Sequence, residues 1–413
     1  MDNEEKEKKS IEKETKDWKR KFSKSEMILL VIMSLLIGIC IGSLFRQTNI
    51  ITKSTSYKNK YVKELVENYE YIINNYYNEI DEQELVNSAI SGMMESLDDP
   101  YSVYFDESDS SNFSITLDGS YEGIGVQVAK DEEEGEIIVV GVLKNSPASE
   151  SGIKAGDRIL SIDEMDASKV SVDEFSSFIK TSNKKQFKLK IKREGEIFEV
   201  DIIRKNITLD SITSEIIEKN NKKIGYIYIG IFANNTYFQF KDALDKLEKE
   251  KIDSLIIDVR DNTGGHLTAV DSILDIFLTD KQKMYGFDQN KKITYTYGTG
   301  NESKKYEIVL LGNELSASAS EVLIAGLKEN LNTKFFGKKT YGKGTVQELV
   351  TLSDGTQYKI TIKKWLTPKG NWINETEGIE PDKEIELDDK YFTTFDMADD
   401  TQLNYAIDYL TKE

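Results

Sequence analysis

Three serines alternate with alanines in the segment SASASE, at a point where the pattern of the chain changes. The apolar run at 308–311 is typical of a strand, and the apolar spacing after the serines predicts a helix. At least one hydroxyl of Ser316, Ser318 and Ser320 is therefore expected at a helix N-terminus, where main-chain N–H groups are unpaired and favour negative charge. A serine in such a place could be a nucleophile whose tetrahedral oxyanion is held by main-chain donors.

A second interpretation of the same segment needs no catalysis. Ser318 is followed three residues later by Glu321, which is the spacing of a capping box. The segment alone does not separate the two interpretations, so the choice depends on whether the chain offers a base.

A lysine is the candidate base, because the composition leaves few other groups. The chain has one histidine, His266, and one cysteine, Cys40, which lies in an apolar run with the character of a membrane segment. A cysteine nucleophile and a histidine-rich metal site are therefore not expected. Lys343 lies between two glycines in a segment that predicts a turn entering a strand. A lysine desolvated in a cleft loses its proton readily enough to act as a general base; the alternative is a solvated loop lysine.

Length and charge limit the elements that position these residues. At 413 residues, the chain is long enough for two or three domains. Its net charge of -19 argues against nucleic acid as a partner. No metal or other cofactor is expected. The segment 337–343 has the spacing of a phosphate-binding loop, but Gly344 stands where a Ser or Thr would hold magnesium.

The N-terminal region predicts attachment to a membrane. Residues 1–26 are densely charged and too poor in apolar residues to form a core, which is typical of a disordered tail. Residues 27–45 carry no charge and predict an uncleaved transmembrane signal anchor, with a linker at 46–56. Six Lys or Arg precede this run within 15 residues and four follow it, which places the tail in the cytoplasm. The predicted location is the cell membrane, single-pass, with the catalytic part on the extracytoplasmic side.

Residues 57–116 are predicted to be a helical N-terminal segment. Apolar residues recur there at helical spacing in two stretches, the second of which begins with Asp81 and Glu84. The turn signal LDDPYS at 97–102 ends this pair. Two amphipathic helices are too small to be stable alone, so they are expected to pack on another domain or a second subunit.

Residues 117–205 consist of short β-type runs with one central helix. The motifs GIGV, SPA and AGDRILSID follow one another in an order that resembles a PDZ domain. The resemblance implies capture of a peptide C-terminus, with the peptide added as a strand beside 126–129. The main-chain N–H groups that would bind its carboxylate belong to Gly123, Ile124, Gly125 and Val126.

Residues 206–390 alternate strand and helix patterns, which is typical of an α/β fold, and 391–413 end in a predicted helix. A buried strand runs into DVRDNTGG, whose two glycines, Gly264 and Gly265, permit close approach of the backbone at a helix start. They could supply a second oxyanion donor, although a simple helix-entry turn explains them equally well.

With these pieces assembled, the chain from about residue 57 to 390 resembles the carboxyl-terminal processing proteases, also called tail-specific proteases. The motifs that carry the match occur in one order: LDDPYSVYF, the PDZ pattern, DVRDNTGG, SASASE, YGKGTVQ, WLTP and GIEPD. The fold expected is α/β multidomain, with an α/β serine-lysine protease core, an inserted β-rich PDZ domain, an N-terminal helical segment and one transmembrane helix.

By this resemblance, Ser318 is the nucleophile, Lys343 is the general base and Gln347 orients the lysine. Four residues after the lysine, the glutamine could return to the same side of an extended strand. The resemblance also implies an oxyanion hole made of main-chain N–H groups, which we place at Ala319 and at Gly264 or Gly265. The family usually carries a proline before the paired glycines, where this chain has Thr263, and that lowers the expected rigidity of the loop.

The implied activity is serine endopeptidase cleavage of a protein or peptide substrate with a free C-terminus, which the PDZ domain delivers while gating access. Homodimers could form through 57–96 and the final helix at 401–410. Two alternatives remain open. The chain could be a catalytically inactive membrane-tethered PDZ adaptor or chaperone, or it could be an esterase, which would have no use for capture of a tail.

Overall fold

The computed structural model describes residues 59–412, except 106, 132–133, 301–303, 305, 353–355 and 395. The chain divides into two compact units, Met1–Val86 and Asn87–Glu413. The predicted tail, membrane anchor and linker, residues 1–56, lie outside the described residues. Within the described ranges, no helix is both long and apolar enough to cross a membrane.

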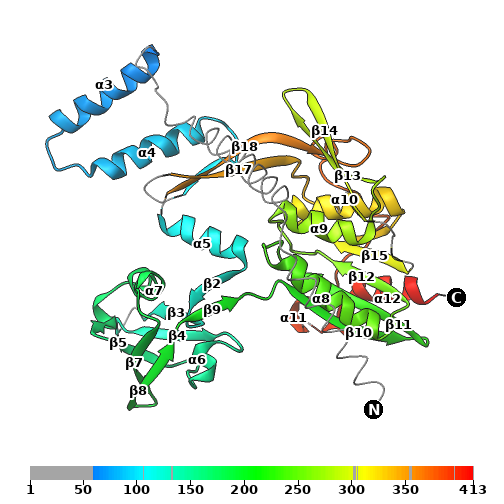
Figure 1. Cartoon of the computed structure of the whole chain (residues 1–413), viewed down its shortest axis with the longest axis horizontal. Coiled ribbons are helices and arrows are strands. Elements are labelled where there is room, and N and C mark those ends of the chain that lie inside the picture. The colour runs from blue at the N-terminus through cyan, green and yellow to red at the C-terminus, as the bar shows by residue number, and fades with distance from the viewer. Residues whose placement is uncertain are drawn as a thin grey trace, which may run out of the picture. The chain divides into compact units, whose positions relative to one another are not determined.

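Two helices follow the first described residue, as predicted: α3 (Lys60–Asn75) and α4 (Glu82–Glu95), the second of which crosses the boundary between the units (Figure 1). The side chain of Asn59 caps α3 by accepting a hydrogen bond from the N–H of Tyr61. Neither helix contains a buried residue. Their apolar faces are therefore exposed to solvent in the isolated chain.

The β-rich region after these helices is built around one antiparallel sheet. In sheet order the strands are β3 (Val126–Lys130), β4 (Ile137–Val142), β5 (Arg158–Ile162), β7 (Gln186–Arg193) and β8 (Glu196–Ile203), with β6 (Met165–Asp166) paired to β5. Two helices, α6 (Pro147–Glu150) and α7 (Val172–Thr181), belong to the same region. The strand β3 lies at an edge of this sheet. A second pair, β2 (Ser120–Gly123) and β9 (Lys205–Thr208), connects the first and last parts of the region.

The α/β region contains a six-stranded sheet. Its order is β10 (Ile212–Lys219), β11 (Lys222–Ile229), β12 (Ser254–Asp258), β15 (Glu307–Gly312), β16 (Lys334–Gly337) and β19 (Lys383–Glu384). All neighbours are parallel except β10 and β11. Every residue of β12 is buried, as expected for a parallel strand that is covered on both faces.

Helices cover both faces of this sheet. On one face, α8 (Thr236–Lys249), α9 (Leu267–Phe277) and α10 (Ala319–Leu331) form the larger core with Ile257 of β12 (Figure 1). On the other face, α12 (Thr401–Thr411) packs on a core that includes Ile256. Adjacent strand residues face opposite sides, so the two cores are separated by a single layer of backbone.

A second sheet was not predicted from the sequence. Its strands are β1 (Val103–Phe105), β18 (Gln357–Leu366), β13 (Lys283–Gln289) and β14 (Lys292–Tyr297), with β17 (Thr345–Thr351) paired to β18. The strands β17 and β18 form a long antiparallel ribbon (Figure 1). A helix, α5 (Glu107–Asp118), follows β1. The segment that carries Lys343 enters this sheet at β17.

Candidate active site

The Ser318 hydroxyl is the one in SASASE that remains available for chemistry. Ser318 is the N-cap of α10 and is partly exposed, as predicted for one of the three serines. Ser316 is fully buried and its hydroxyl donates to the carbonyl of Val259 at 2.8 Å. Ser320 is also fully buried and donates to the carbonyl of Asn262 at 2.8 Å. Within the described residues, the Ser318 hydroxyl donates no hydrogen bond, so its proton is free to be removed.

The main chain at Ser318 is strained and held by a neighbouring loop. Its φ angle is +55°, which is uncommon for a residue with a side chain. Such conformations persist where the surroundings fix them, and they gather at functional sites. The surroundings here include Asn262, whose carbonyl accepts a hydrogen bond from the N–H of Ala317 at 3.1 Å. Gly264 lies so close that an added Cβ would be 3.0 Å from Ser318 Cβ. The loop DVRDNTGG and the serine turn are thus packed backbone to backbone.

Two main-chain N–H groups beside this turn remain without an acceptor among the described residues. The N–H of Ala319 belongs to the first helical position, which has no partner within a helix. The N–H of Gly265 makes no described hydrogen bond either, and Gly265 is exposed. By contrast, the N–H of Gly264 donates to Asn262 Oδ1 at 2.9 Å. Of the two glycines, Gly265 is therefore the one whose N–H has no acceptor among the described residues.

A buried carboxylate joins the serine turn to the lysine segment. Glu321 accepts hydrogen bonds from the N–H of Ser318 at 2.8 Å and from the N–H of Lys343 at 2.9 Å. It also accepts from the N–H of Gly342 at 2.7 Å and from the hydroxyl of Thr340 at 2.6 Å. Burial raises the pKa of Glu321, and the hydrogen bonds it accepts counteract part of that rise. The capping contact to Ser318 is present, but the same side chain also positions the lysine.

Lys343 is fixed through its backbone and largely desolvated at its amine. Its carbonyl accepts a hydrogen bond from the indole of Trp365 at 2.7 Å. Its Nζ lies 4.7 Å from the centre of the Tyr101 ring. Burial lowers the pKa of Lys343 to about 8, helped by the charge of Lys359 and opposed by Asp99 and Glu321. The neutral amine that a general base requires is therefore accessible near physiological pH.

The turn LDDPYS forms one wall around this amine. Ser102 donates to Asp99 at 2.6 Å and accepts from the N–H of Thr361 on β18 at 3.0 Å. The turn is thereby fastened to the second sheet, and it places Tyr101 beside Lys343. The sequence identified this stretch as the end of the N-terminal helices and as a motif of the family resemblance, without assigning it a place beside the lysine.

Gln347 lies on β17 and contacts threonines. Its Nε2 donates to Thr345 Oγ1 and to Thr361 Oγ1, both at 3.0 Å. The register between β17 and β18 shifts between Val346 and Gln347, and the extra residue lies on β18. Within the described residues, no hydrogen bond joins Gln347 to Lys343 or Ser318 to Lys343.

A buried ion network fixes the other end of DVRDNTGG. Arg260 donates to both oxygens of Asp258 and of Asp400, and also to Gln402 Oε1. All three charged residues are at most 6% exposed. Removing one partner from such a network leaves an uncompensated buried charge. The loop that carries the paired glycines is therefore anchored to the start of α12.

Family models match three successive parts of the chain. They are described as "Activating protease CtpB N-terminal domain" at residues 44–109, "PDZ domain" at 114–192 and "Peptidase family S41" at 223–385. The carboxy-terminal processing protease CtpB of Bacillus subtilis is 38% identical over 83% of this chain and 71% of its own length. The chain belongs to the carboxy-terminal processing proteases. It is a serine peptidase of family S41 with a PDZ domain.

A second relative from Bacillus subtilis agrees with this assignment. The carboxy-terminal processing protease CtpA of Bacillus subtilis is 35% identical over 82% of this chain and 72% of its own length. Among solved structures, the photosystem II D1 C-terminal processing protease has a TM-score of 0.46 and 24% identity, over 80% of this chain and 88% of that one.

In this carboxy-terminal processing protease, the predicted carboxylate-binding loop lies between β2 and β3. The carbonyl of Ile124 accepts from the N–H of Ala148 at 2.9 Å, and that of Gly125 accepts from Leu143 at 3.0 Å. No described residue accepts from the N–H of Ile124 or Gly125. Gly123 ends β2 and Val126 starts β3. The carbonyl groups of the loop are therefore paired, whereas the N–H groups of these two residues have no acceptor among the described residues.

The single histidine of this serine peptidase faces away from the nucleophile turn. His266 is the N-cap of α9, and its imidazole lies near the backbone of Leu117 and the charge of Asp118. Burial lowers its pKa, and its Nε2 is buried without a described partner. Among the described residues, no hydrogen bond links it to Ser318 or to Glu321, whereas Glu321 binds the main chain of both Ser318 and Lys343.

Proposed function

We propose that this protein is a membrane-anchored serine endopeptidase that cleaves proteins recognised by their C-terminal tails, with Ser318 as nucleophile and Lys343 as general base. One observation carries the proposal. The carboxylate of Glu321 accepts hydrogen bonds from the main-chain N–H groups of both residues. We call this carboxylate the clamp, because it holds together a hydroxyl that donates no hydrogen bond and a desolvated amine. Serine-lysine pairs are an established variant of the catalytic triad.

In the first half of the reaction, neutral Lys343 takes the proton of the Ser318 hydroxyl as Oγ attacks the carbonyl carbon of the substrate. The bond from that carbon to the amide nitrogen then breaks, and the lysine ammonium gives its proton to the leaving nitrogen. The product is an ester between the serine and the acyl part of the substrate. In the second half, water attacks this ester while the lysine takes its proton and returns one to Oγ.

The oxyanion would be stabilised by the N–H groups of Ala319 and Gly265. Both donors are part of the main chain and are already oriented, so little reorganisation accompanies the reaction. Gly264 could contribute only if its hydrogen bond to Asn262 opened. Gln347 would orient the lysine after a change of rotamer, since its amide contacts two threonines in this structure.

The PDZ domain would deliver the substrate and gate access to the site. The free N–H groups of Ile124 and Gly125 suit a terminal carboxylate, and the edge strand β3 suits an added peptide strand. Specificity would come from apolar residues at the tail, since the acidic surface does not attract acidic peptides. Competition by a peptide with a free carboxylate, and none by its amide, is the expected result; equal competition by both would refute tail capture.

Residues 27–45 would anchor the protein in the cell membrane with the peptidase outside the cytoplasm. Their apolar, uncharged character supports this part of the proposal. The exposed apolar faces of α3 and α4 support association into homodimers.

The test is cleavage of an unstructured protein with an apolar C-terminus by the full chain in detergent micelles. Ser318→Ala and Lys343→Ala should each lower kcat by at least about 100-fold, because a general base contributes roughly that much. Circular dichroism would verify that both variants fold. Undiminished cleavage by either variant would refute the pair. A wild-type protein that binds tails without cleaving would support the adaptor alternative, and turnover of esters alone would indicate an esterase.

A further inference from the structure

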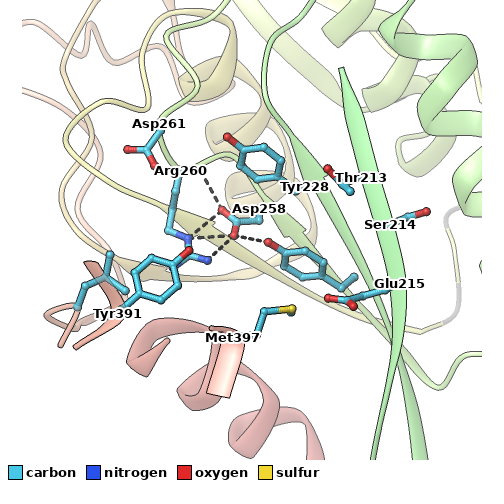
Figure 2. A pocket seen from close by; sticks show the side chains of 11 residues that line it. Thr213, Ser214, Glu215, Tyr228, Asp258, Arg260, Asp261, Tyr391 and Met397 are labelled. Carbon is cyan, nitrogen blue, oxygen red and sulfur yellow. Dashed lines mark hydrogen bonds and ion pairs between the residues drawn. The ribbon is translucent and has the colours of Figure 1, made fainter. Parts of the chain in front are cut away.

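A second pocket lies on the α12 side of the six-stranded sheet, at the carboxyl ends of β11 and β12 (Figure 2). Its volume is about 420 Å³, which is within the usual range for small-molecule sites. The proposed nucleophile follows β15 and starts α10, a helix that packs on the opposite face of the sheet. The lining residues are Thr213, Ser214, Glu215, Tyr226, Tyr228, Asp258, Arg260, Asp261, Leu387, Tyr391 and Met397.

The arginine in this pocket is not available for an anion. A guanidinium has five N–H donors. In Arg260 all of them have acceptors, supplied by Asp258, Asp400 and Gln402. The two carboxylates also outweigh its single positive charge. An anionic ligand would have to break a buried, fully paired network. Binding of a phosphate or carboxylate group is therefore unfavourable in this pocket.

Negative charge and aromatic rings dominate the remaining lining. Glu215 is exposed and has no described hydrogen bond or ion pair, and Asp261 adds a second exposed carboxylate. Among the described residues, no lysine lines the pocket. Tyr226 is fixed by donating to Asp258 at 2.8 Å. In the view of Figure 2, Tyr228 and Tyr391 lie on either side of the Asp258–Arg260 pair.

We propose that this pocket binds an organic cation, an alkylammonium or guanidinium group, against its tyrosines and between Glu215 and Asp261. Aromatic faces attract such cations most when water is partly excluded, and nearby carboxylates add charge attraction. The tyrosines stay neutral, since burial raises the pKa of Tyr228 and the charges of Asp258 and Asp261 add to the rise. The cation could belong to a free small molecule or to an arginine or lysine side chain of a peptide.

A cation bound in this pocket would restrict the motion of the loop 258–265. Asp261 has a φ of +60° and is held by a pair of hydrogen bonds with Asn313, at 2.9 and 2.8 Å. The N–H of Asn313 in turn donates to the hydroxyl of Ser316 at 2.9 Å. A cation bound between Asp261 and Tyr391 would tie this loop to the C-terminal segment. This inference does not depend on the catalytic roles proposed above.

The test is calorimetric titration of the full-length protein in an uncharged detergent at low ionic strength. The first arm compares n-butylguanidinium with its neutral isostere n-butylurea. The second arm compares an acetyl-Gly-Arg-Gly-amide peptide with the same peptide carrying citrulline, so that blocked termini avoid the carboxylate loop. Saturable binding of either guanidinium, about tenfold tighter than its neutral partner, is expected. Binding of n-butylguanidinium alone would identify a site for free small molecules. Binding of both guanidinium compounds would show that the site also accepts an arginine side chain of a peptide. No saturable binding of either guanidinium, or equal binding of the neutral compounds, would overturn the proposal.

Variants locate the binding. Glu215→Gln and Tyr228→Leu should each weaken guanidinium binding at least about threefold, whereas Tyr228→Phe retains the ring and should bind almost normally. Glu218→Gln, on the same strand but outside the pocket, is the matched control. Hydrogen exchange of residues 258–265 should slow when the guanidinium binds. The proposal would be contradicted if both single variants, Glu215→Gln and Tyr228→Leu, kept the wild-type affinity for the guanidinium. It would also be contradicted if hydrogen exchange in the loop 258–265 did not change at saturation.

Discussion

The two halves of the candidate active site are held by different physical means. On the nucleophile side, the main chain around Ser318 is fixed by backbone packing against Gly264 and by hydrogen bonds from the serine turn. On the base side, the amine of Lys343 has no described hydrogen bond and lies near an aromatic ring. The comparison separates two kinds of control. Backbone geometry controls the proposed nucleophile, whereas desolvation and neighbouring charge control the proposed base.

This arrangement predicts three kinds of mutational effect. Changes on the nucleophile side should lower kcat equally at every pH, because they displace the reacting atom. Changes on the base side should move the pH profile, because they alter the pKa of Lys343. Changes in the clamp that joins the halves should affect rate and stability together.

The largest effect is expected from Glu321→Gln. Each carboxylate oxygen of Glu321 now accepts two hydrogen bonds, so the new amide nitrogen would face two of these four donors. Leaving buried donors unpaired costs about 1–3 kcal/mol each. We expect a drop in kcat of at least about 100-fold, from loss of positioning in both halves, and a lower denaturation midpoint in urea. Glu329→Gln, on the same helix, is the control. A stable variant with normal kcat would show that the clamp does not position the pair.

The second prediction breaks only the nucleophile side. Gly264→Ala would place a Cβ 3.0 Å from the carbonyl of Ala317 and from Ser318 Cβ, at a φ of +113°. We expect kcat to fall about 10- to 100-fold with an unchanged pH profile, since small displacements of reacting groups have effects of this size. Gly195→Ala is the matched control, because its φ is +87° but nothing lies within 4 Å of the added Cβ. Similar kcat losses in both variants would remove the argument for close packing.

The third prediction addresses only the base side. The charge of Lys359 lowers the pKa of Lys343, so Lys359→Met should raise it above about 8. The base works when neutral, so the rise of kcat/KM with pH should shift to higher pH. Activity near pH 7 should fall several-fold, while the plateau at high pH is retained. Lys359→Arg keeps the charge and should keep the profile. A profile that does not move in the methionine variant would show that the two lysines are not coupled.

The smallest effect is expected from Gln347→Ala. Its amide contacts Thr345 and Thr361 instead of the lysine, so we expect kcat to fall less than about tenfold and the pH profile to remain, because neutral hydrogen bonds contribute about 1 kcal/mol. Thr361→Val removes one of the two acceptors and serves as a comparison. A loss comparable to that of Lys343→Ala would instead assign the glutamine a direct role in proton transfer.

Local pattern was sufficient to predict much of the fold. The strands expected at 126–129 and 308–311 and the helix expected at 401–410 correspond to β3, β15 and α12 to within one residue at each end. The Ser-x-Ser pattern before apolar residues placed a hydroxyl at the start of α10, which the structure confirms. These features depend on neighbours within a few positions, which a sequence displays directly.

The missed features depend on contacts between distant residues. Glu321 meets Lys343 across 22 positions, and Arg260 meets Asp400 across 140. In the second sheet, β18 pairs with β1, which lies more than 250 positions earlier in the chain. The register shift of β18 opposite Gln347 is also invisible in a two-residue period. Spacing along the chain carries no direct signal for such pairings.

The bond between Arg260 and Asp400 has a consequence for the order of biosynthesis. Ser318 and Lys343 leave the ribosome before Asp400 and Gln402, which complete the network that anchors the DVRDNTGG loop. A growing chain therefore contains the proposed nucleophile and base before it contains the residues that anchor the neighbouring loop. We expect a nascent chain arrested before residue 400 to be inert towards substrate and to gain activity only after release. The anchor of this loop is therefore complete only after residue 402 has been translated.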